Sequence, residues 1–221
     1  MVVEDTMEQQ KIIEATTTFV KNILQHDSSG HDWWHIERVR KAALQIGEKE
    51  NANLFVVEMA ALLHDVADEK LNKSEEEGLM KVRSWLSSLQ ITESEQEEVI
   101  EIISTMSFKG GSRPPMKTIE GQVVQDADRL DAIGAIGIAR TFAYAGAHGD
   151  LIYDPELPFR ESMTKHEYRN GKSTAVNHFY EKLLKLKDTL NTNAAKKAAQ
   201  ERHDFMTAFL DQLYKEWNGQ L

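Results

Sequence analysis

The sequence contains no cysteine. Disulfides, cysteine-ligated metal sites and thiol nucleophiles are therefore excluded, and the absence fits a reducing compartment. No apolar run approaches the roughly 20 residues that a membrane-spanning helix needs. The acidic start, MVVEDTMEQQKIIEA, lacks the basic and apolar stretches of a signal peptide. We therefore expect a cytoplasmic protein that does not act at a membrane.

Basic residues are outnumbered by acidic ones. Lysine and arginine total 26 against 36 acidic residues, which leaves a net charge of −10. This balance argues against broad binding to nucleic acid or anionic membranes. A small anionic substrate remains compatible, because a metal ion or local cations can override the global field. The chain also has no Walker A loop and no Gly-x-Ser-x-Gly motif, so P-loop NTPase and acyl-enzyme chemistry are not expected.

Proline is rare, with four residues in 221, and helical periodicity dominates the sequence. No alternating strand pattern of any length is present. The sequence predicts one all-α domain over 1–221, with a core at about 20–150 and a C-terminal helical extension at about 151–217. Helices are predicted at 7–25, 31–50, 54–66, 74–89, 93–106, 121–146, 173–190 and 193–217.

Two segments interrupt the helical pattern. Residues 107–121 (SFKGGSRPPMKTIEG) contain a glycine pair, a proline pair and three cations. Residues 147–174 are longer, with two prolines and mixed charge. Loops of this length are uncommon and are often functional. An ordinary surface connection is an equal alternative for each segment.

Two strong metal ligands, His64 and Asp65, directly follow the apolar run 59–63 (MAALL). Burying a charge is costly unless the charge is paired or bound to a metal. The dipeptide His-Asp occurs four times in the chain, but only this copy follows an apolar run. We therefore expect further partners for it elsewhere in the fold.

Two other predicted helices carry ligands of the same kinds: His35 in GHDWWHIERV, and the acidic cluster QDADRLDAIG. Asp128 and Asp131 are three residues apart and share a helix face, whereas Asp126 faces elsewhere. Two imidazoles and two carboxylates suit a divalent ion. On spacing alone, this metal site competes with a buried core histidine and ordinary ion pairs.

The order His…His-Asp…Asp on helices resembles the HD-domain superfamily of metal-dependent phosphohydrolases. The segments GHDWWHIERV, LLHDVADEK and VVQDADRLDAIGAIGIAR look like the bacterial YedJ/YpgQ-like subgroup, and the similarity extends over about residues 20–217. The resemblance implies a single helical HD-domain fold with a metal site between central helices. The metal ligands that it implies are His35, His64, Asp65 and Asp128, with Asp131 as the alternative fourth ligand.

The resemblance also implies roles beyond metal ligation. Asp68 lies one helical turn beyond the first ligand of the His-Asp pair and is implied as a proton-handling residue, with a helix-end carboxylate as the alternative. His31 is implied as a second proton carrier, or as a residue that starts a helix. Phosphate contacts are implied for Arg38, Lys109 and Arg129, and ordinary surface charge is the alternative for the last two.

The chemistry implied by the resemblance is hydrolysis of a phosphate ester or anhydride with one divalent ion: Mn, Mg, Co, Ni or Fe. One ion is expected because no histidine lies between Asp65 and Asp128, unlike in two-metal phosphodiesterases and di-iron oxygenases of the superfamily. A nucleotide is favoured, and in particular a (deoxy)nucleoside triphosphate cleaved to monophosphate and pyrophosphate. The alternatives are a nucleoside monophosphatase, a nucleotide-binding regulatory module and a structural helical protein. The oligomeric state stays open, with a homodimer among the alternatives.

Overall fold

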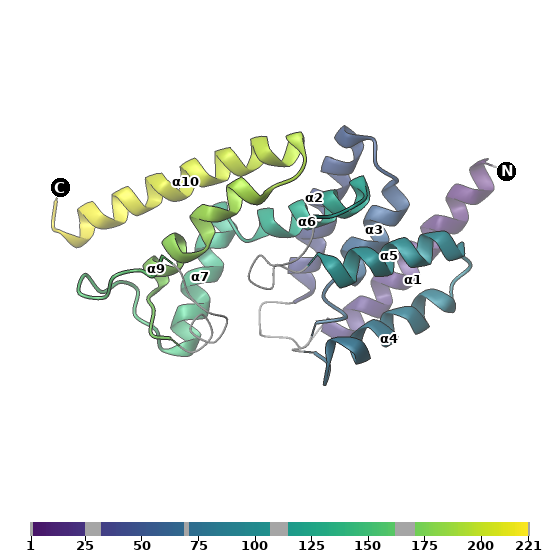
Figure 1. Cartoon of the computed structure of the whole chain (residues 1–221), viewed down its shortest axis with the longest axis horizontal. Helices are drawn as coiled ribbons and strands as arrows, with labels where there is room; N and C mark the ends of the chain where they lie inside the picture. Colours follow the sequence, from purple (N-terminus) through teal and green to yellow (C-terminus); the bar gives the residue numbers. More distant parts are fainter. Residues whose placement is uncertain (1, 25–31, 69–70, 107–114, 162–170, 221) are drawn as a thin grey trace. The chain divides into compact units, whose positions relative to one another are not determined.

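The computed structural model describes residues 2–24, 32–68, 71–106, 115–161 and 171–220. Within these ranges the chain forms helices and no β-strand, which confirms the all-α prediction (Figure 1). Contacts between backbone segments divide the chain into two compact units, Met1–Ala127 and Asp128–Leu221.

The first unit contains five helices within its described residues and most of a sixth. These are α1 (Val2–Leu24), α2 (Trp33–Glu50), α3 (Leu54–Leu63), α4 (Glu75–Ser87), α5 (Glu93–Thr105) and α6 (Ile119–Asp131), which crosses the boundary between the units. The second unit contains α7 (Gly134–His148), α9 (Ala175–Glu181), the 3₁₀-helix η2 (Leu183–Thr189) and α10 (Asn193–Trp217).

The central helix of the first unit is α3, which contacts α1, α2 and α5. Its sequence, LFVVEMAALL, is apolar on almost every side, and a helix of this composition is stable only when it is buried. Val57, Leu62 and Leu63 are fully buried. The side chain of Asn53 caps the start of the helix by accepting hydrogen bonds from the next turn. The end of α3 is therefore placed firmly inside the core.

The predicted helix at 121–146 is wrong, because α6 and α7 are separate helices with a break between them. Gly134 has φ +75°, which is outside the helical range and unfavourable for other residues. A Cβ on Gly137 would lie 2.3 Å from the carbonyl oxygen of Ala132, so the break is also tightly packed. Apolar and small residues continue through AIGAIGIA, and the periodicity therefore did not reveal the break.

The predicted helix at 173–190 is likewise two elements, α9 and η2. Two backbone hydrogen bonds connect the start of α9 to the chain just after α7: the N–H groups of Ala175 and Val176 donate to the carbonyls of Leu151 and Ile152 at 2.9 and 3.0 Å.

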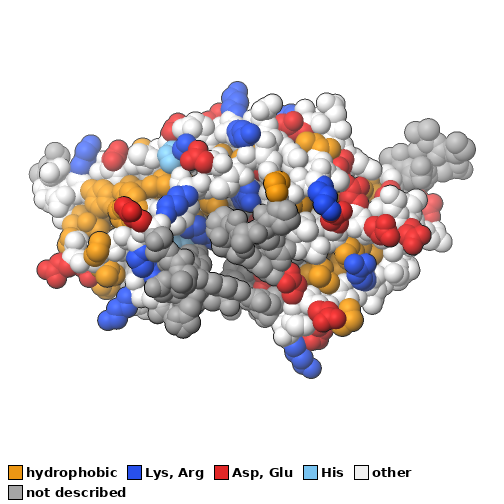
Figure 2. Space-filling model, in the orientation of Figure 1, with side chains coloured by type: hydrophobic (Ala, Val, Ile, Leu, Met, Phe, Trp, Pro, Cys, Tyr) orange, Lys and Arg blue, Asp and Glu red, His pale blue; other side chains and the backbone are white. Residues whose placement is uncertain are grey.

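Hydrophobic side chains gather on the surface of the second unit in Figure 2. Within the described ranges, no helix has the length and apolar character needed to cross a membrane.

Candidate metal centre

His35 lies in the first turn of α2, and the residue before that helix fixes where it starts. Asp32 is the N-cap, and its side chain accepts a hydrogen bond of 2.8 Å from the backbone N–H of His35. Ile36 and Val39 on the same helix are fully buried, and only 3% of His35 is exposed. The cap and the core together hold the imidazole in place.

His64 and Asp65 lie where α3 ends. The predicted helix at 54–66 is too long, because α3 stops at Leu63 and the backbone N–H of Val66 bonds back to the Leu63 carbonyl at 3.1 Å, in a tight turn. His64 and Asp65 are 8% and 7% exposed. The apolar helix therefore delivers an imidazole and a carboxylate into the core, at its C-terminal end.

The three predicted ligands of the first unit converge. The Nε2 atoms of His35 and His64 are 3.3 Å apart, and they lie 3.4 Å from Oδ2 and Oδ1 of Asp65, respectively. Two atoms that each bind a shared ion at about 2.1 Å are roughly 3.0–3.4 Å apart at octahedral or tetrahedral angles. The spacing and the donor set therefore fit one divalent ion held by His35, His64 and Asp65.

A backbone hydrogen bond orients His64 for this role. Its Nδ1 lies 2.8 Å from the carbonyl oxygen of Ala61. A carbonyl can only accept, so Nδ1 carries the proton and donates. In the neutral imidazole, Nε2 then presents its lone pair toward His35 and Asp65. Metal-binding histidines commonly use their other ring nitrogen in this way.

The turn after His64 and Asp65 has two supports that the sequence pattern does not reveal. The side-chain amide of Asn72 donates to the carbonyls of Val66 and Asp68 at 2.8 and 2.9 Å. A Cβ on Gly78 in α4 would lie 2.5 Å from the carbonyl oxygen of Ala67, so only glycine allows α4 this close to the turn. A glycine inside a helical pattern is costly and often has a packing reason, which was the available signal.

The acidic cluster of α6 divides by burial. Asp126 is fully buried, Asp128 is half-buried and Asp131 is 5% exposed. Asp131 forms an ion pair with Arg140, at 2.7 Å between carboxylate and guanidinium. The alternative fourth ligand therefore already has a cationic partner within the second unit. Asp128 as the fourth ligand stays a prediction.

The residues implied in proton and phosphate handling have differing surroundings. Arg38 is half-buried on α2. The Arg129 guanidinium donates to the backbone carbonyl of Thr189, and this bond ties α6 to the end of η2 in the second unit. His31 and Lys109 lie outside the described residues.

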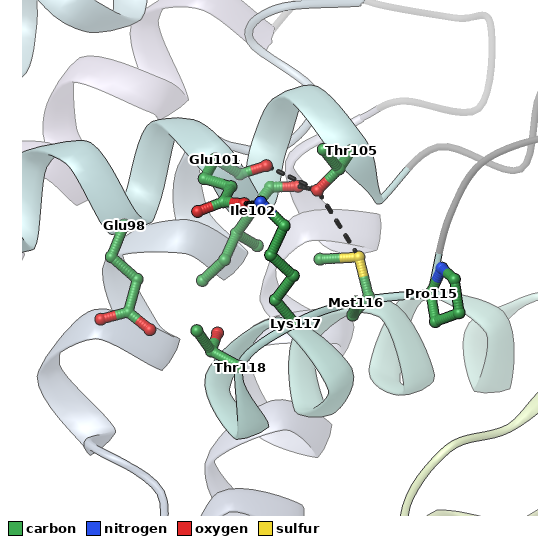
Figure 3. Close-up of a pocket in the computed structure, with 8 residues that line it drawn as sticks. All are labelled: Glu98, Glu101, Ile102, Thr105, Pro115, Met116, Lys117 and Thr118. Carbon is green, nitrogen blue, oxygen red and sulfur yellow. Dashed lines mark hydrogen bonds and ion pairs between the residues drawn. The ribbon is translucent and has the colours of Figure 1, made fainter.

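A small cavity of about 20 Å³ lies between α5 and the residues that lead into α6 (Figure 3). Its lining includes Glu101, which forms an ion pair with Lys117, and Thr105, whose hydroxyl donates to the Glu101 carbonyl. A volume of this size holds about one water molecule. The cavity cannot accept a nucleotide.

The fold and the site together define an all-helical protein with a buried His-His-Asp group suited to one divalent ion. The family model described as HD domain matches residues 33–133. This match contains α2, α3 and the whole group of His35, His64 and Asp65.

Relatives resemble nearly the whole chain. The uncharacterized protein YpgQ of Bacillus subtilis is 44% identical over 216 residues, which is 96% of this chain and 97% of YpgQ. A crystal structure of an HD-superfamily hydrolase from Bacillus thuringiensis is 55% identical, with a TM-score of 0.79, and covers 96% of this chain and 100% of that one. The crystal structure of YpgQ in complex with ADP is 42% identical, with a TM-score of 0.76, over 95% and 96% of the two chains.

The chain belongs to the HD-domain superfamily, among the HD-superfamily hydrolases related to YpgQ. The family binds divalent metal, and the group of His35, His64 and Asp65 is the candidate site for it in this chain.

Proposed function

We propose that the protein is a metal-dependent phosphohydrolase acting on a nucleotide, with cleavage of (deoxy)nucleoside triphosphates to monophosphate and pyrophosphate as the favoured reaction. The observation that supports it best is the buried group of His35, His64 and Asp65, in which the two Nε2 atoms are 3.3 Å apart and each lies 3.4 Å from a different oxygen of Asp65. We propose Asp128 as the fourth ligand. A divalent ion held there would act as a Lewis acid toward the phosphoryl group and would lower the pKa of a bound water.

The other residues would act on the proton and on the phosphate charge. Asp68, three residues beyond the ligand Asp65 and half-buried, is the proposed acceptor of the proton from the attacking water. His31 is proposed as a second proton carrier. The proposed phosphate-binding cations are Arg38, Lys109 and Arg129, whose positive charge offsets the charge that spreads over the phosphoryl oxygens.

The nucleotide as substrate has independent support from a relative. YpgQ, which covers nearly this whole chain, has been crystallised in complex with ADP. A site that accepts a nucleoside diphosphate in a relative favours a nucleotide over a sugar phosphate here. The second candidate is a nucleoside monophosphatase, and the third is a nucleotide-binding module with little turnover.

The metal assignment is tested with two substitutions at neighbouring acids. Asp65→Ala should lose metal content and turnover together, because it removes a ligand. Asp68→Asn should keep the metal but lower kcat on the order of 100-fold, as expected for a proton acceptor. Metal analysis of chelator-free protein and steady-state kinetics give both readouts. Asp211→Ala, at an exposed carboxylate on α10, is the matched control and should change neither.

Retention of stoichiometric metal by Asp65→Ala would contradict the ligand assignment. A near-normal kcat for Asp68→Asn would leave Asp68 as a carboxylate that only ends a turn.

The substrate is decided by a panel of nucleoside tri-, di- and monophosphates and sugar phosphates, each with Mg, Mn, Co and Ni, and with products resolved. Triphosphates should show the higher kcat/KM, and Lys109→Ala should raise KM for a triphosphate more than for a monophosphate. Preferred turnover of monophosphates, together with equal effects of Lys109→Ala on both substrates, would replace the triphosphate proposal with a monophosphatase. Nucleotide binding without turnover under any metal would favour the regulatory module.

A further inference from the structure

Trp34 is the most exposed large hydrophobic residue among the described residues, at 67%. The other two tryptophans of the first unit are fastened to α1. Trp33 lies under the Lys21 ammonium, 4.5 Å from the ring centroid, and Trp85 stacks on Phe19 with a centroid separation of 4.2 Å. Within the described ranges, no hydrogen bond or ring contact involves Trp34. No hydrogen bond or ring contact within the described ranges therefore accounts for an indole at this position.

The position of Trp34 on α2 relates it to the metal ligand. Successive residues turn by about 100° around a helix axis. Arg38 therefore lies about 60° from His35, and Trp34 lies about 40° further in the same direction. Exposure rises along this order, from 3% at His35, through the half-buried Arg38, to 67% at Trp34. The helix face leads from a buried metal ligand past a guanidinium to an open aromatic surface.

This order matches the chemical order of a nucleotide. Phosphates bind metal ions and guanidinium groups, whereas a base offers a flat aromatic face. Base stacking on an aromatic side chain is tolerant of base identity, because every base has such a face. A single exposed aromatic residue is common on protein surfaces, so it is the order along α2 that assigns a role to Trp34.

We infer that the Trp34 indole is the surface on which the base of a nucleotide stacks while its phosphates lie at Arg38 and the metal ligands. The inference rests on the proposed function, and it adds the prediction that a nucleoside contributes to binding beyond the phosphates. Trp34 would act on affinity for the base and not on the bond that is cleaved.

The experiment compares the affinities of ADP and inorganic pyrophosphate for manganese-loaded protein, by calorimetry. Trp34→Ala should weaken ADP binding roughly 5- to 100-fold, as expected for the loss of one stacked base, and leave pyrophosphate binding unchanged. Trp34→Phe should restore most of the affinity for ADP. Trp217→Ala removes another exposed tryptophan, on α10, and should change neither affinity. Circular dichroism checks that each variant is folded.

An unchanged affinity of Trp34→Ala for ADP, or equal losses for ADP and pyrophosphate, overturns the inference. Either result leaves the proposed function intact if the wild-type protein still hydrolyses nucleotides with metal. A wild-type protein that neither binds ADP nor hydrolyses any nucleotide overturns both.

Discussion

At the residue scale, the candidate site depends on the end of one buried helix. Because α3 is apolar and buried, the turn that ends it places His64 and Asp65 in the core. The hydrogen bond from His64 Nδ1 to the Ala61 carbonyl then selects the tautomer. The backbone thus orients this candidate pair of metal ligands.

The fourth ligand can be assigned by comparing two carboxylates of α6. Asp128→Asn should lower metal affinity with little effect on the free energy of unfolding. Asp131→Asn should do the reverse, because Asp131 is 5% exposed and pairs with Arg140; we expect a loss of about 1–3 kcal/mol. Metal titration and urea unfolding measure the two effects. A larger loss of metal affinity in Asp131→Asn would exchange the two roles.

Much of the candidate site could be predicted from the sequence. The sequence singles out His64 and Asp65 because they follow an apolar run, and His35 because it lies in another amphipathic helix. In the structure the three side chains converge. The supporting roles of Asn72 and Gly78 could not be predicted, because they depend on contacts with a turn whose path the sequence does not reveal. Support of this kind is a tertiary property and leaves no periodic pattern.

At the scale of elements, α4 packs closely against the turn that follows the candidate ligands His64 and Asp65. Helix propensity alone predicts that Gly78→Ala would stabilise α4 by about 0.5–1 kcal/mol. The added methyl group would lie 2.5 Å from the Ala67 carbonyl, however, and that backbone atom cannot move without moving the turn. We expect the clash to dominate, so that Gly78→Ala lowers both thermal stability and metal affinity.

Thermal unfolding and metal titration of Gly78→Ala provide the test. Ser87→Ala, in the last turn of the same helix and exposed, is a control that should have little effect. A Gly78→Ala protein with raised stability and normal metal affinity would show that helix propensity outweighs the contact.

We expect His178 in α9 to make the stability of the second unit sensitive to acid. Burial lowers the pKa of His178 to about 4, the positive charge of Lys182 lowers it as well, and Glu181 opposes them. Between the ordinary value of 6.5 and about 4, the unfolded chain binds a proton that the folded chain does not. The free energy of unfolding should therefore fall as the pH is lowered through this window.

Urea unfolding near pH 7 and near pH 4.5 measures this dependence. His178→Gln cannot titrate, and its loss of stability between the two pH values should be smaller than that of the wild type by about 2–3 kcal/mol. Identical losses in the two proteins would assign the acid sensitivity to other groups.

The element boundaries show what periodicity can and cannot predict. Capped amphipathic helices such as α4 and α5 were predicted to within a few residues, because a capping residue and an apolar stripe mark them. The break between α6 and α7 was missed, because it depends on Gly134 and Gly137 within an uninterrupted run of small and apolar residues. There, backbone conformation and close packing decide the structure.

At the scale of the whole molecule, the chain folds as two compact units whose boundary falls inside α6, between Ala127 and Asp128. A helix that contributes to both units should couple their unfolding. We therefore keep the prediction of a single domain and expect one calorimetric transition with equal calorimetric and van't Hoff enthalpies. Two separate transitions, or a stable fragment 128–221, would instead show independent domains.

The group of His35, His64 and Asp65 has a final consequence for a chain without cysteine. A bound ion would join residues that are 29 positions apart in the sequence, and so would act as a reversible cross-link between α2 and the end of α3. Because a preformed site rarely exists in the unfolded chain, the free energy of binding the ion would add to the stability of the folded state. The metal would then stabilise the fold through a link that a chelator can remove, a role that a disulfide often has in a secreted protein.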